Sequence, residues 1–299
     1  MEVPPMHPGP ASRELLLLQG NHRSSYIWDG QCLAQTFCPK RIDDMWEFIR
    51  DYPLHPRIVR RLQDTGFYRI IEIGQWQFDW ALITAMIERW RPETYTFHLS
   101  IGEATIMIED VEVLFGLPVD GLPVAYPLAL RDYKGVHYLY MLQRLTSFQP
   151  AELTTLSGAS RLQPTLVWKH LAAMDAEITD DSLSEDIDRH TRLLLLLIFD
   201  GVLFPNTSGN IVSLRLLHHL ERLDDLPGYS WGEVVLGYLY RQMCRTCMGT
   251  QRDVAGFLPL LQFYQLGLQM LQHNGEGAVA LHVFGCRVTD LAVETLRRA

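Results

Sequence analysis

Two cysteines and two histidines are the residues of this sequence whose type and spacing come nearest to a metal or redox site. Cys244 and Cys247 have the C-x-x-C spacing of half a zinc site or of a redox dithiol. A structural zinc needs four ligands, and no second pair follows. Both sulfurs fall near the C-terminus of a predicted helix, which raises a thiol pKa, so we interpret them as inert. His218 and His219 are adjacent. On a helix their side chains would point about 100° apart, so they could not both coordinate one metal ion from the same face of the helix.

A second group of residues suggests metal-dependent hydrolysis. The segment Gly20-Asn21-His22-Arg23 is similar to the Gly-Asn-His-Glu box of metallophosphatases, in which Asn and His serve a two-metal centre. Those enzymes also carry Gly-Asp boxes, and this sequence has no Gly-Asp dipeptide.

Acidic residues of the first half could form a three-carboxylate site of the transposase type, but such sites need a multi-stranded sheet, and predicted strands are few. We interpret these carboxylates as solvated. They are Asp43, Asp44, Glu72, Asp79, Glu88, Glu103, Glu109 and Asp110.

Other catalytic motifs are missing from the sequence. It has no phosphate-binding loop, dinucleotide fingerprint, zinc-protease helix or nucleophile elbow. The lysines, Lys40, Lys134 and Lys169, do not stand in a context typical of a pyridoxal Schiff base. We assign no catalytic, cofactor-binding or metal-binding residue and expect no cofactor. Whether the protein is an enzyme stays open, and the lack of a phosphatase, aminotransferase, kinase or NTPase motif favours a non-enzymatic role.

The composition indicates a protein with a sizeable core and an acidic balance. The 299 residues are 47% hydrophobic and carry a formal net charge of −9, which disfavours coating nucleic acid or an anionic membrane. Five cysteines without a dense framework, and no signal peptide, are typical of a reducing intracellular compartment. The longest apolar run, Leu193–Phe199, is far shorter than the roughly 20 residues of a membrane span. We expect an intracellular protein without a membrane segment.

The secondary structure predicted around these residues is mainly helical. Strand patterns are rare, with Tyr68–Ile73 and Val279–Phe284 the candidates outside one hairpin. The sequence therefore predicts a mainly α domain of the α+β class with a small β-hairpin near residues 96–108. Helical spacing of apolar residues occurs around 42–49, 58–62, 78–90, 136–145, 182–204, 211–223, 231–248, 259–272 and 289–298.

The stretch from Thr96 to Gly121 predicts that hairpin and a short helix after it. Apolar and polar residues alternate from Phe97 to Ile108, interrupted by Gly102-Glu103, which we expect to form a two-residue turn. The acidic residues that follow suit a helix N-terminus, and Gly116 with Pro118 should end that helix. Three prolines within residues 118–127 then make a second helix unfavourable, so a helix-turn-helix DNA-binding element is not expected here.

The chain ends differ in composition from the rest of the chain. We expect the proline-rich residues 1–14 to form a disordered arm. Residues 15–272 should form one domain, with the polar stretch 147–164 as a candidate seam between subdomains, and residues 273–299 should form a C-terminal extension.

Several blocks of this sequence, in order, together resemble the plant mobile domain. That family is also labelled aminotransferase-like, and it includes the MAIN-like proteins and the long-form homologues of a plant serine/threonine phosphatase of the seven type. The blocks are His22–Gly30, Pro53–Ile70, Asp79–Leu99, Gly102–Gly121, Phe199–Asn210 and Tyr229–Cys247.

The resemblance implies a non-enzymatic nuclear interaction module linked to transposable-element silencing, genome integrity and meristem maintenance. Its implied partner is a phosphatase-like protein or a chromatin factor. Two alternatives stay open: a transposon-derived enzyme of the nuclease or transposase kind, and DNA binding through an arginine-lined face. An enzyme predicts carboxylates that converge in one pocket, whereas an interaction module predicts an exposed apolar patch.

Overall fold

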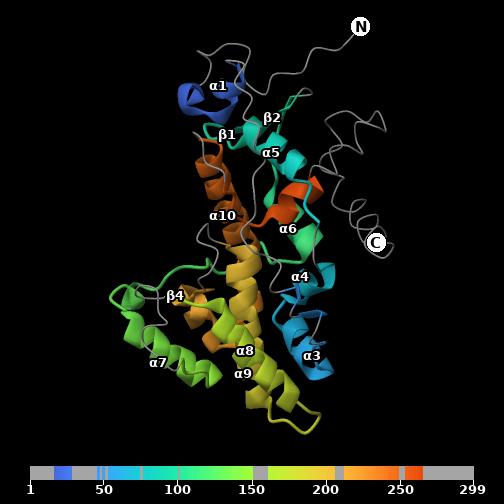
Figure 1. The fold of residues 1–299 in the computed structure, drawn as a ribbon, viewed down its shortest axis with the longest axis vertical. Coiled ribbons are helices and arrows are strands. Elements are labelled where there is room, and N and C mark those ends of the chain that lie inside the picture. Colours follow the sequence, from blue (N-terminus) through green and yellow to red (C-terminus); the bar gives the residue numbers. More distant parts are fainter. Residues whose placement is uncertain are drawn as a thin grey trace. The chain divides into compact units, whose positions relative to one another are not determined.

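The structure is a computed structural model, and it describes residues 17–28, 46–47, 49–50, 53–74, 77–99, 102–150, 161–205, 212–248 and 253–264. The described residues form two compact units. Unit 1 takes those within Met1–Lys40, Trp76–Leu114 and Val235–Ala299, and unit 2 those within Arg41–Gln75 and Phe115–Val234. Helices dominate both units (Figure 1), which confirms the predicted mainly α, α+β class.

Nine labelled α-helices and five short strands make up most of the described chain. The α-helices are α1 (Arg23–Trp28), α3 (Pro56–Asp64), α4 (Tyr68–Ile73), α5 (Trp80–Arg89), α6 (Ile108–Phe115), α7 (Gly135–Thr146), α8 (Pro164–Glu177), α9 (Ser184–Ile198) and α10 (Trp231–Thr246). The strands are β1 (Trp90–Arg91), β2 (Thr96–Leu99), β3 (Gly102–Ala104), β4 (Arg161–Leu162) and β5 (Val212–Ser213). Turns of 3-10 helix occur at η1 (Gln19–Asn21), η2 (Leu128–Leu130), η5 (Leu214–Glu221) and η6 (Leu223–Gly228), and η4 (Phe199–Leu203) is a π-helix that continues α9.

A three-stranded antiparallel sheet, in the order β1-β2-β3, lies in unit 1. The register pairs Leu99 with Gly102. The predicted hairpin is thus confirmed, but the turn predicted at Gly102-Glu103 is wrong, because both residues belong to β3. The sequence pattern does not anticipate β1. Trp90, at the end of a predicted helix, lies in β1 instead, fully buried, with its ring centroid 4.9 Å from that of Phe97.

Helix α6 begins at Ile108, where the sequence pattern predicts the end of the second strand. The Asp110 carboxylate in its first turn accepts a hydrogen bond from the Met107 amide at 2.7 Å. This contact is half of a capping box, and it favours a helix start over a longer strand. The short helix itself is confirmed, with Val111 fully buried on its apolar face.

Residues Tyr68–Ile73 form helix α4, so the strand predicted there from aromatic and β-branched side chains is wrong. Ile70 and Ile73 are both buried, and their spacing of three places them on one face of a helix. Gly74 ends the helix with a φ of +77°, a conformation that favours glycine. Tertiary burial therefore outweighs local strand propensity here. The other strand candidate, Val279–Phe284, and the helix predicted at 289–298 lie outside the described residues.

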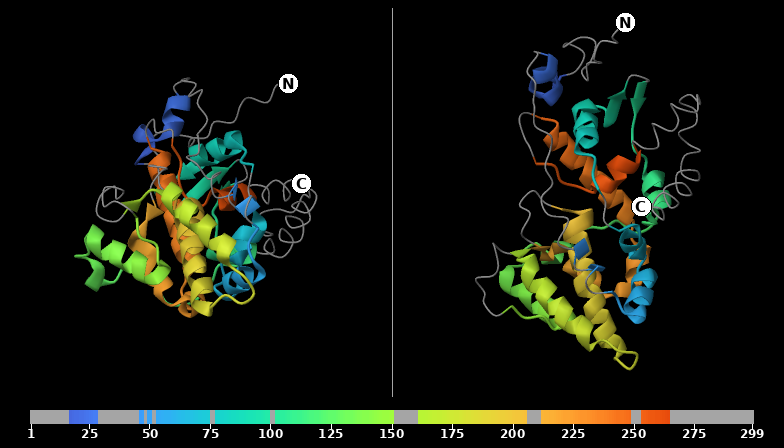
Figure 2. Two further views of the ribbon diagram at one scale, coloured as in Figure 1. Left: turned by 60° about the horizontal axis from the view of Figure 1, so that its bottom comes forward. Right: turned by 45° about the vertical axis from the view of Figure 1, so that its right-hand side comes forward.

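Helix α9 is the central helix of unit 2. It contacts α3, α7 and α8, and α3 and α7 flank it on opposite sides in all three views (Figures 1 and 2). Its residues Leu193–Ile198 are at most 2% exposed, so this part is buried all round. Directly after it, the Phe199 ring packs against Phe67 and Trp231, with centroids 5.0 and 4.8 Å away. These side chains form the core of unit 2.

Residues 118–122 and 228–232, far apart in sequence, meet backbone to backbone in unit 2. Three hydrogen bonds of 2.8–2.9 Å join them, from Leu122 N to Gly228 O, from Ser230 N to Leu122 O and from Gly232 N to Pro118 O. We call this contact the glycine junction. No helix follows α6 in residues 116–127, which confirms that a recognition helix is absent from that stretch.

Glycine is required within this junction. A Cβ atom on Gly121 would lie 2.5 Å from Gly228 O, and the φ of Gly121 is +145°, which L side chains rarely adopt. On the other segment, a Cβ atom on Gly232 would lie 2.8 Å from the Val119 side chain. The absence of side chains at these two positions therefore allows the backbones to approach.

The predicted domain boundaries stay predictions. The arm at 1–14, the extension at 273–299 and residues 151–160 of the candidate seam at 147–164 lie outside the described residues. Within the described residues, no helix combines the length and the apolar character that a membrane crossing requires.

The glycine junction gives the first prediction. Gly121→Ala should destabilise the protein by about 2–4 kcal/mol, because the methyl group combines an unfavourable φ with an overlap against backbone. Urea unfolding followed by circular dichroism measures this change. Gly228→Ala is the matched control, since nothing lies within 4 Å of the added Cβ atom. A Gly121→Ala protein as stable as the Gly228→Ala protein would contradict the junction.

Candidate functional site

Cys244 lies in the last turn of α10 and Cys247 directly after that helix, in the part of the chain that belongs to unit 1. The indole Nε1 of Trp90 donates a hydrogen bond to Cys244 Sγ at 3.3 Å. Burial is the largest cause that raises the pKa of the Cys244 thiol, and it raises the pKa of Cys247 to about 12. Because the thiolate is the nucleophile and the metal ligand, these shifts favour the protonated, less reactive form of both thiols at neutral pH.

His22, from the Gly20-Asn21-His22-Arg23 segment, belongs to a buried polar cluster in unit 1. Its Nε2 donates to the Trp90 carbonyl at 2.8 Å, and its Nδ1 accepts from the Ser24 amide at 3.1 Å, partners that assign this tautomer. The guanidinium of Arg91 lies against the ring, 3.0 Å from Nε2, and both side chains are at most 2% exposed. Burial, then the Arg91 charge, lowers the pKa of His22 to about 4. A neutral His22 thus ties the N-terminal segment to β1.

His218 and His219 lie side by side in η5, with ring centroids 3.9 Å apart. His218 Nδ1 donates to the Arg215 carbonyl at 2.8 Å. Burial lowers the pKa of both rings, to about 4 for His219. Both are therefore neutral at pH 7 and take part in the packing of unit 2.

The acidic residues of the first half are dispersed over separate structural contacts. Asp79 caps α5 by accepting from the Leu82 amide at 3.0 Å. Glu72 pairs with Arg69 at 2.7 Å, and Glu88 pairs with Arg23 at 3.2 Å. Over the part of the chain that the structure describes, no three His, Cys, Asp or Glu side chains are placed to hold a metal ion. Asp43 and Asp44 lie outside that part.

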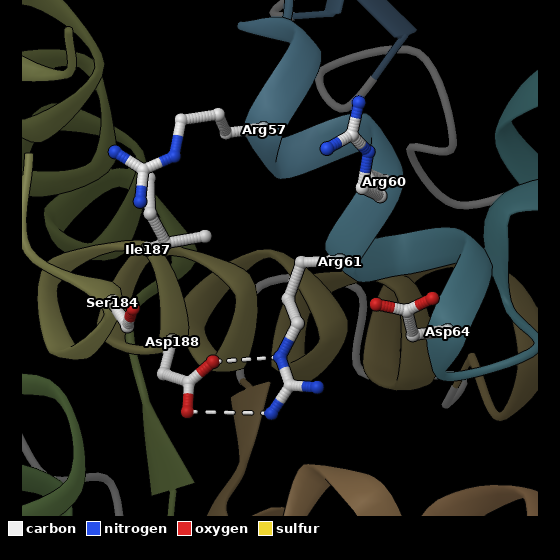
Figure 3. A pocket seen from close by; sticks show the side chains of 7 residues that line it. All are labelled: Arg57, Arg60, Arg61, Asp64, Ser184, Ile187 and Asp188. Atoms are coloured by element: carbon white, nitrogen blue, oxygen red, sulfur yellow. Dashed lines mark hydrogen bonds and ion pairs between the residues drawn. The ribbon is translucent and has the colours of Figure 1, made fainter. Parts of the chain in front are cut away.

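A pocket between α3 and α9 in unit 2 brings three arginines together (Figure 3). Its volume is about 300 Å³, which suits a ligand the size of a single side chain. Arg57, Arg60 and Arg61 all come from α3, at spacings that place them on neighbouring rows of one helix. The remaining lining residues are Asp64 at the end of α3 and, from α9, Ser184, Ile187 and Asp188.

Arg61 forms ion pairs with two carboxylates. Its Nε donates to Asp188 at 2.7 Å and its Nη2 to the other oxygen at 3.3 Å, as the dashed lines in Figure 3 show. Its Nη1 donates to Asp224 at 2.6 Å. Burial lowers the pKa of Arg61, but the hydrogen bonds to these two carboxylates outweigh that effect and raise the pKa overall. Asp188 also lies 3.7 Å from Arg192, so its charge is compensated from two sides.

Arg57 binds the turn between α8 and α9 through one of its three guanidinium nitrogens. Its Nη1 donates to the backbone carbonyls of Asp180 at 2.9 Å, Thr179 at 3.4 Å and Ser182. Its Nε and Nη2 donate to no described residue. Arg60 is exposed, and its whole guanidinium is likewise without a hydrogen bond or ion pair to any described residue. In the pocket, Arg57 therefore has two nitrogens, and Arg60 its whole guanidinium, without a hydrogen-bond acceptor among the described residues.

No local pattern in the sequence marks this pocket. The visible signal is the spacing of Arg57, Arg60 and Arg61, but arginine is common throughout the chain and supplies 23 of its 26 basic residues. The partners on α9 are more than 120 positions away along the chain, and no local pattern connects them to α3.

Exposed apolar side chains concentrate in another part of unit 2. Of the ten large apolar side chains that are exposed among the described residues, five lie between Leu122 and Tyr140. Leu128 is 83% exposed and Tyr140 69%. Val136 and Tyr140 are four residues apart on α7 and share one face, while α7 contacts α9 and η5. We call Leu122, Tyr126, Leu128, Val136 and Tyr140 the exposed apolar segment.

The chain belongs to the plant mobile domain family, since the family model described as "Plant mobile domain" matches residues 66–273. This confirms the resemblance noted from the sequence blocks. The matched range contains the glycine junction and the exposed apolar segment. It begins after α3, which carries the three arginines of the pocket.

Curated proteins of Arabidopsis thaliana are similar to most of this chain. "Serine/threonine-protein phosphatase 7 long form homolog" is 33% identical over 265 residues, which cover 87% of this chain and 18% of that protein. "Protein MAIN-LIKE 2" is 32% identical over 276 residues, covering 90% and 38%, and "Protein MAINTENANCE OF MERISTEMS" is 30% identical over 248 residues, covering 83% and 49%. The chain therefore spans less than half the length of each. No solved structure matches.

The neutral, buried state of His22 predicts sensitivity to acid. Its folded-state pKa of about 4 lies below the unfolded value of 6.5, so between these values the unfolded chain binds a proton that the folded chain does not. The stability that neutral His22 contributes to the fold is fully present above pH 6.5. It is lost as the pH falls toward 4, and the total loss is roughly 3 kcal/mol at about 1.4 kcal/mol per pKa unit. Urea unfolding at a series of pH values measures the loss.

His22→Gln isolates this contribution, because the side chain can no longer titrate. The variant should be less stable than the wild type at pH 7.5 and should lose less stability between pH 6.5 and 4. His98→Gln, on partly exposed β2, should follow the wild-type curve. Equal losses in His22→Gln and wild type over that interval would refute the assignment.

Proposed function

We propose that this chain is a non-enzymatic interaction module of the nucleus that acts in transposable-element silencing, genome integrity and meristem maintenance. Its partner is a phosphatase-like protein or a chromatin factor. The names of two relatives support this direction, since one is a phosphatase 7 long form homolog and another is Maintenance of Meristems. The module spans only part of each relative, so the role is proposed for the domain within a larger assembly.

The exposed apolar segment is the observation that carries the proposal. Large apolar side chains on a surface favour burial against a partner, and tyrosine is among the residue types enriched at binding hot spots. Leu128 is 83% exposed, Tyr140 69% and Val136 62%. Val136 and Tyr140 lie on the same face of α7, so a partner could contact both side chains. The opposite side of α7 carries Tyr138 and Leu142, both nearly fully buried. The helix is therefore anchored while its other face remains open for binding.

The double variant Val136→Ser/Tyr140→Ala tests this surface. Because both side chains are exposed, the fold should be kept, and thermal melting should shift little. Affinity for the partner should fall by about 30-fold or more, since truncating a hot-spot side chain costs about 2 kcal/mol or more. Tagged wild-type and variant chains are expressed in plant nuclei, and the proteins that co-purify are quantified by mass spectrometry.

Leu183→Ser is the matched control, because Leu183 is 70% exposed, directly precedes α9 and does not belong to the exposed apolar segment. It should leave recovery unchanged. Recovery of neither a phosphatase-like protein nor a chromatin factor with the wild-type chain would refute the partner. A variant that recovers the partner as well as the wild type would refute the surface. A fluorescent fusion excluded from nuclei would refute the location.

A further inference from the structure

We propose that the pocket between α3 and α9 binds the phosphate group of a phosphorylated serine or threonine side chain in a partner peptide. The proposal is independent of the exposed apolar segment, because that segment contains none of the residues that line the pocket. It rests on the open hydrogen-bond donors of two neighbouring arginines, on the size of the pocket and on the charges that surround it.

The open donors match a phosphate monoester better than a carboxylate. Arg57 offers Nε and Nη2, and Arg60 offers its whole guanidinium, at positions i and i+3 of α3. Planar guanidiniums bind oxyanions through paired N–H donors. A phosphate monoester carries three terminal oxygens and nearly two negative charges at neutral pH, so it has acceptors for both arginines. A carboxylate has two oxygens and one charge, and would leave one guanidinium largely unpaired.

The arginines are held at the pocket by the fold. Arg57 is fixed by its bonds to the carbonyls of Thr179 and Asp180, and Arg61 by Asp188. Only Arg60 has to become ordered when a ligand binds, which limits the loss of side-chain entropy. The volume of about 300 Å³ admits one phosphorylated side chain.

The surroundings of the pocket favour a single phosphate over a nucleic acid. Acidic side chains stand next to the lining residues, with Asp180 94%, Asp224 82% and Glu185 53% exposed. A nucleic acid would bring further phosphates close to these carboxylates, and the chain as a whole carries a charge of −9. A phosphorylated peptide with lysine or arginine on either side instead complements the acidic rim. We therefore assign the pocket to a phosphorylated residue with basic flanks.

The test measures binding of a fluorescein-labelled peptide to the full 299-residue chain by fluorescence anisotropy. The probe is a nine-residue peptide with one central phosphoserine between lysines. It should bind at least tenfold more tightly than the unphosphorylated peptide and than the peptide with glutamate in place of phosphoserine. Duplex DNA of matched phosphate concentration should compete poorly. Equal affinity for phosphorylated and unphosphorylated peptides, or efficient competition by DNA, would overturn the proposal.

Variants of exposed residues assign the binding to the pocket without disturbing the fold. Arg60→Gln should weaken binding by about 10- to 100-fold, as expected for loss of hydrogen bonds to a charged group. Asp64→Asn should strengthen it, because it removes a like charge from the lining. Arg131→Gln is the matched control, an exposed arginine of the same unit outside the pocket, and should leave affinity unchanged. If Arg60→Gln and Arg131→Gln weaken binding equally, the peptide is attracted by positive charge anywhere on the surface, and the pocket assignment is wrong.

Discussion

The glycine junction is the contact on which the arrangement of unit 2 depends. Residues 118–122 and 228–232 can exchange backbone hydrogen bonds only because Gly121 and Gly232 have no side chains. The junction fixes the chain directly before Trp231, whose ring is fully buried in the core. It also fixes the point from which residues 123–134 lead to α7. The same backbone contact thus supports the core on one side and sets the start of the exposed apolar segment on the other.

Polar side chains serve two different purposes in the two units. In unit 1, His22 and Arg91 are buried together, and Asp79 and Asp110 cap helices, so these groups stabilise local structure. In unit 2, α3 places three arginines around a pocket and leaves Arg60 without a partner among the described residues. A buried group whose hydrogen bonds are met has little left to offer a ligand, whereas an open guanidinium beside a cavity can bind one. The open guanidinium of Arg60 beside the pocket is therefore a candidate for ligand binding in unit 2.

Elements with strong local signals were predictable from the sequence, and contacts between distant segments were not. The hairpin and α6 follow from alternation and from acidic residues at a helix start, but the turn position depends on the register between strands, which local pattern does not fix. The residues of α4 have strand propensity and become helical because burial of Ile70 and Ile73 decides. The arginine pocket needs α3 and α9 side by side, and the exposure of Tyr140 depends on which face of α7 packs inward. Both are properties of tertiary structure.

We propose that this member of the plant mobile domain family binds a protein partner through unit 2, with α7 and the residues before it as the contact surface. Hydrogen–deuterium exchange of the full chain, alone and with the recovered partner, tests it most directly. Backbone amides within residues 122–140 should exchange more slowly in the complex, while those around buried His22 should not change. Protection confined to unit 1, with residues 122–140 exchanging at the same rate in both samples, would contradict the claim.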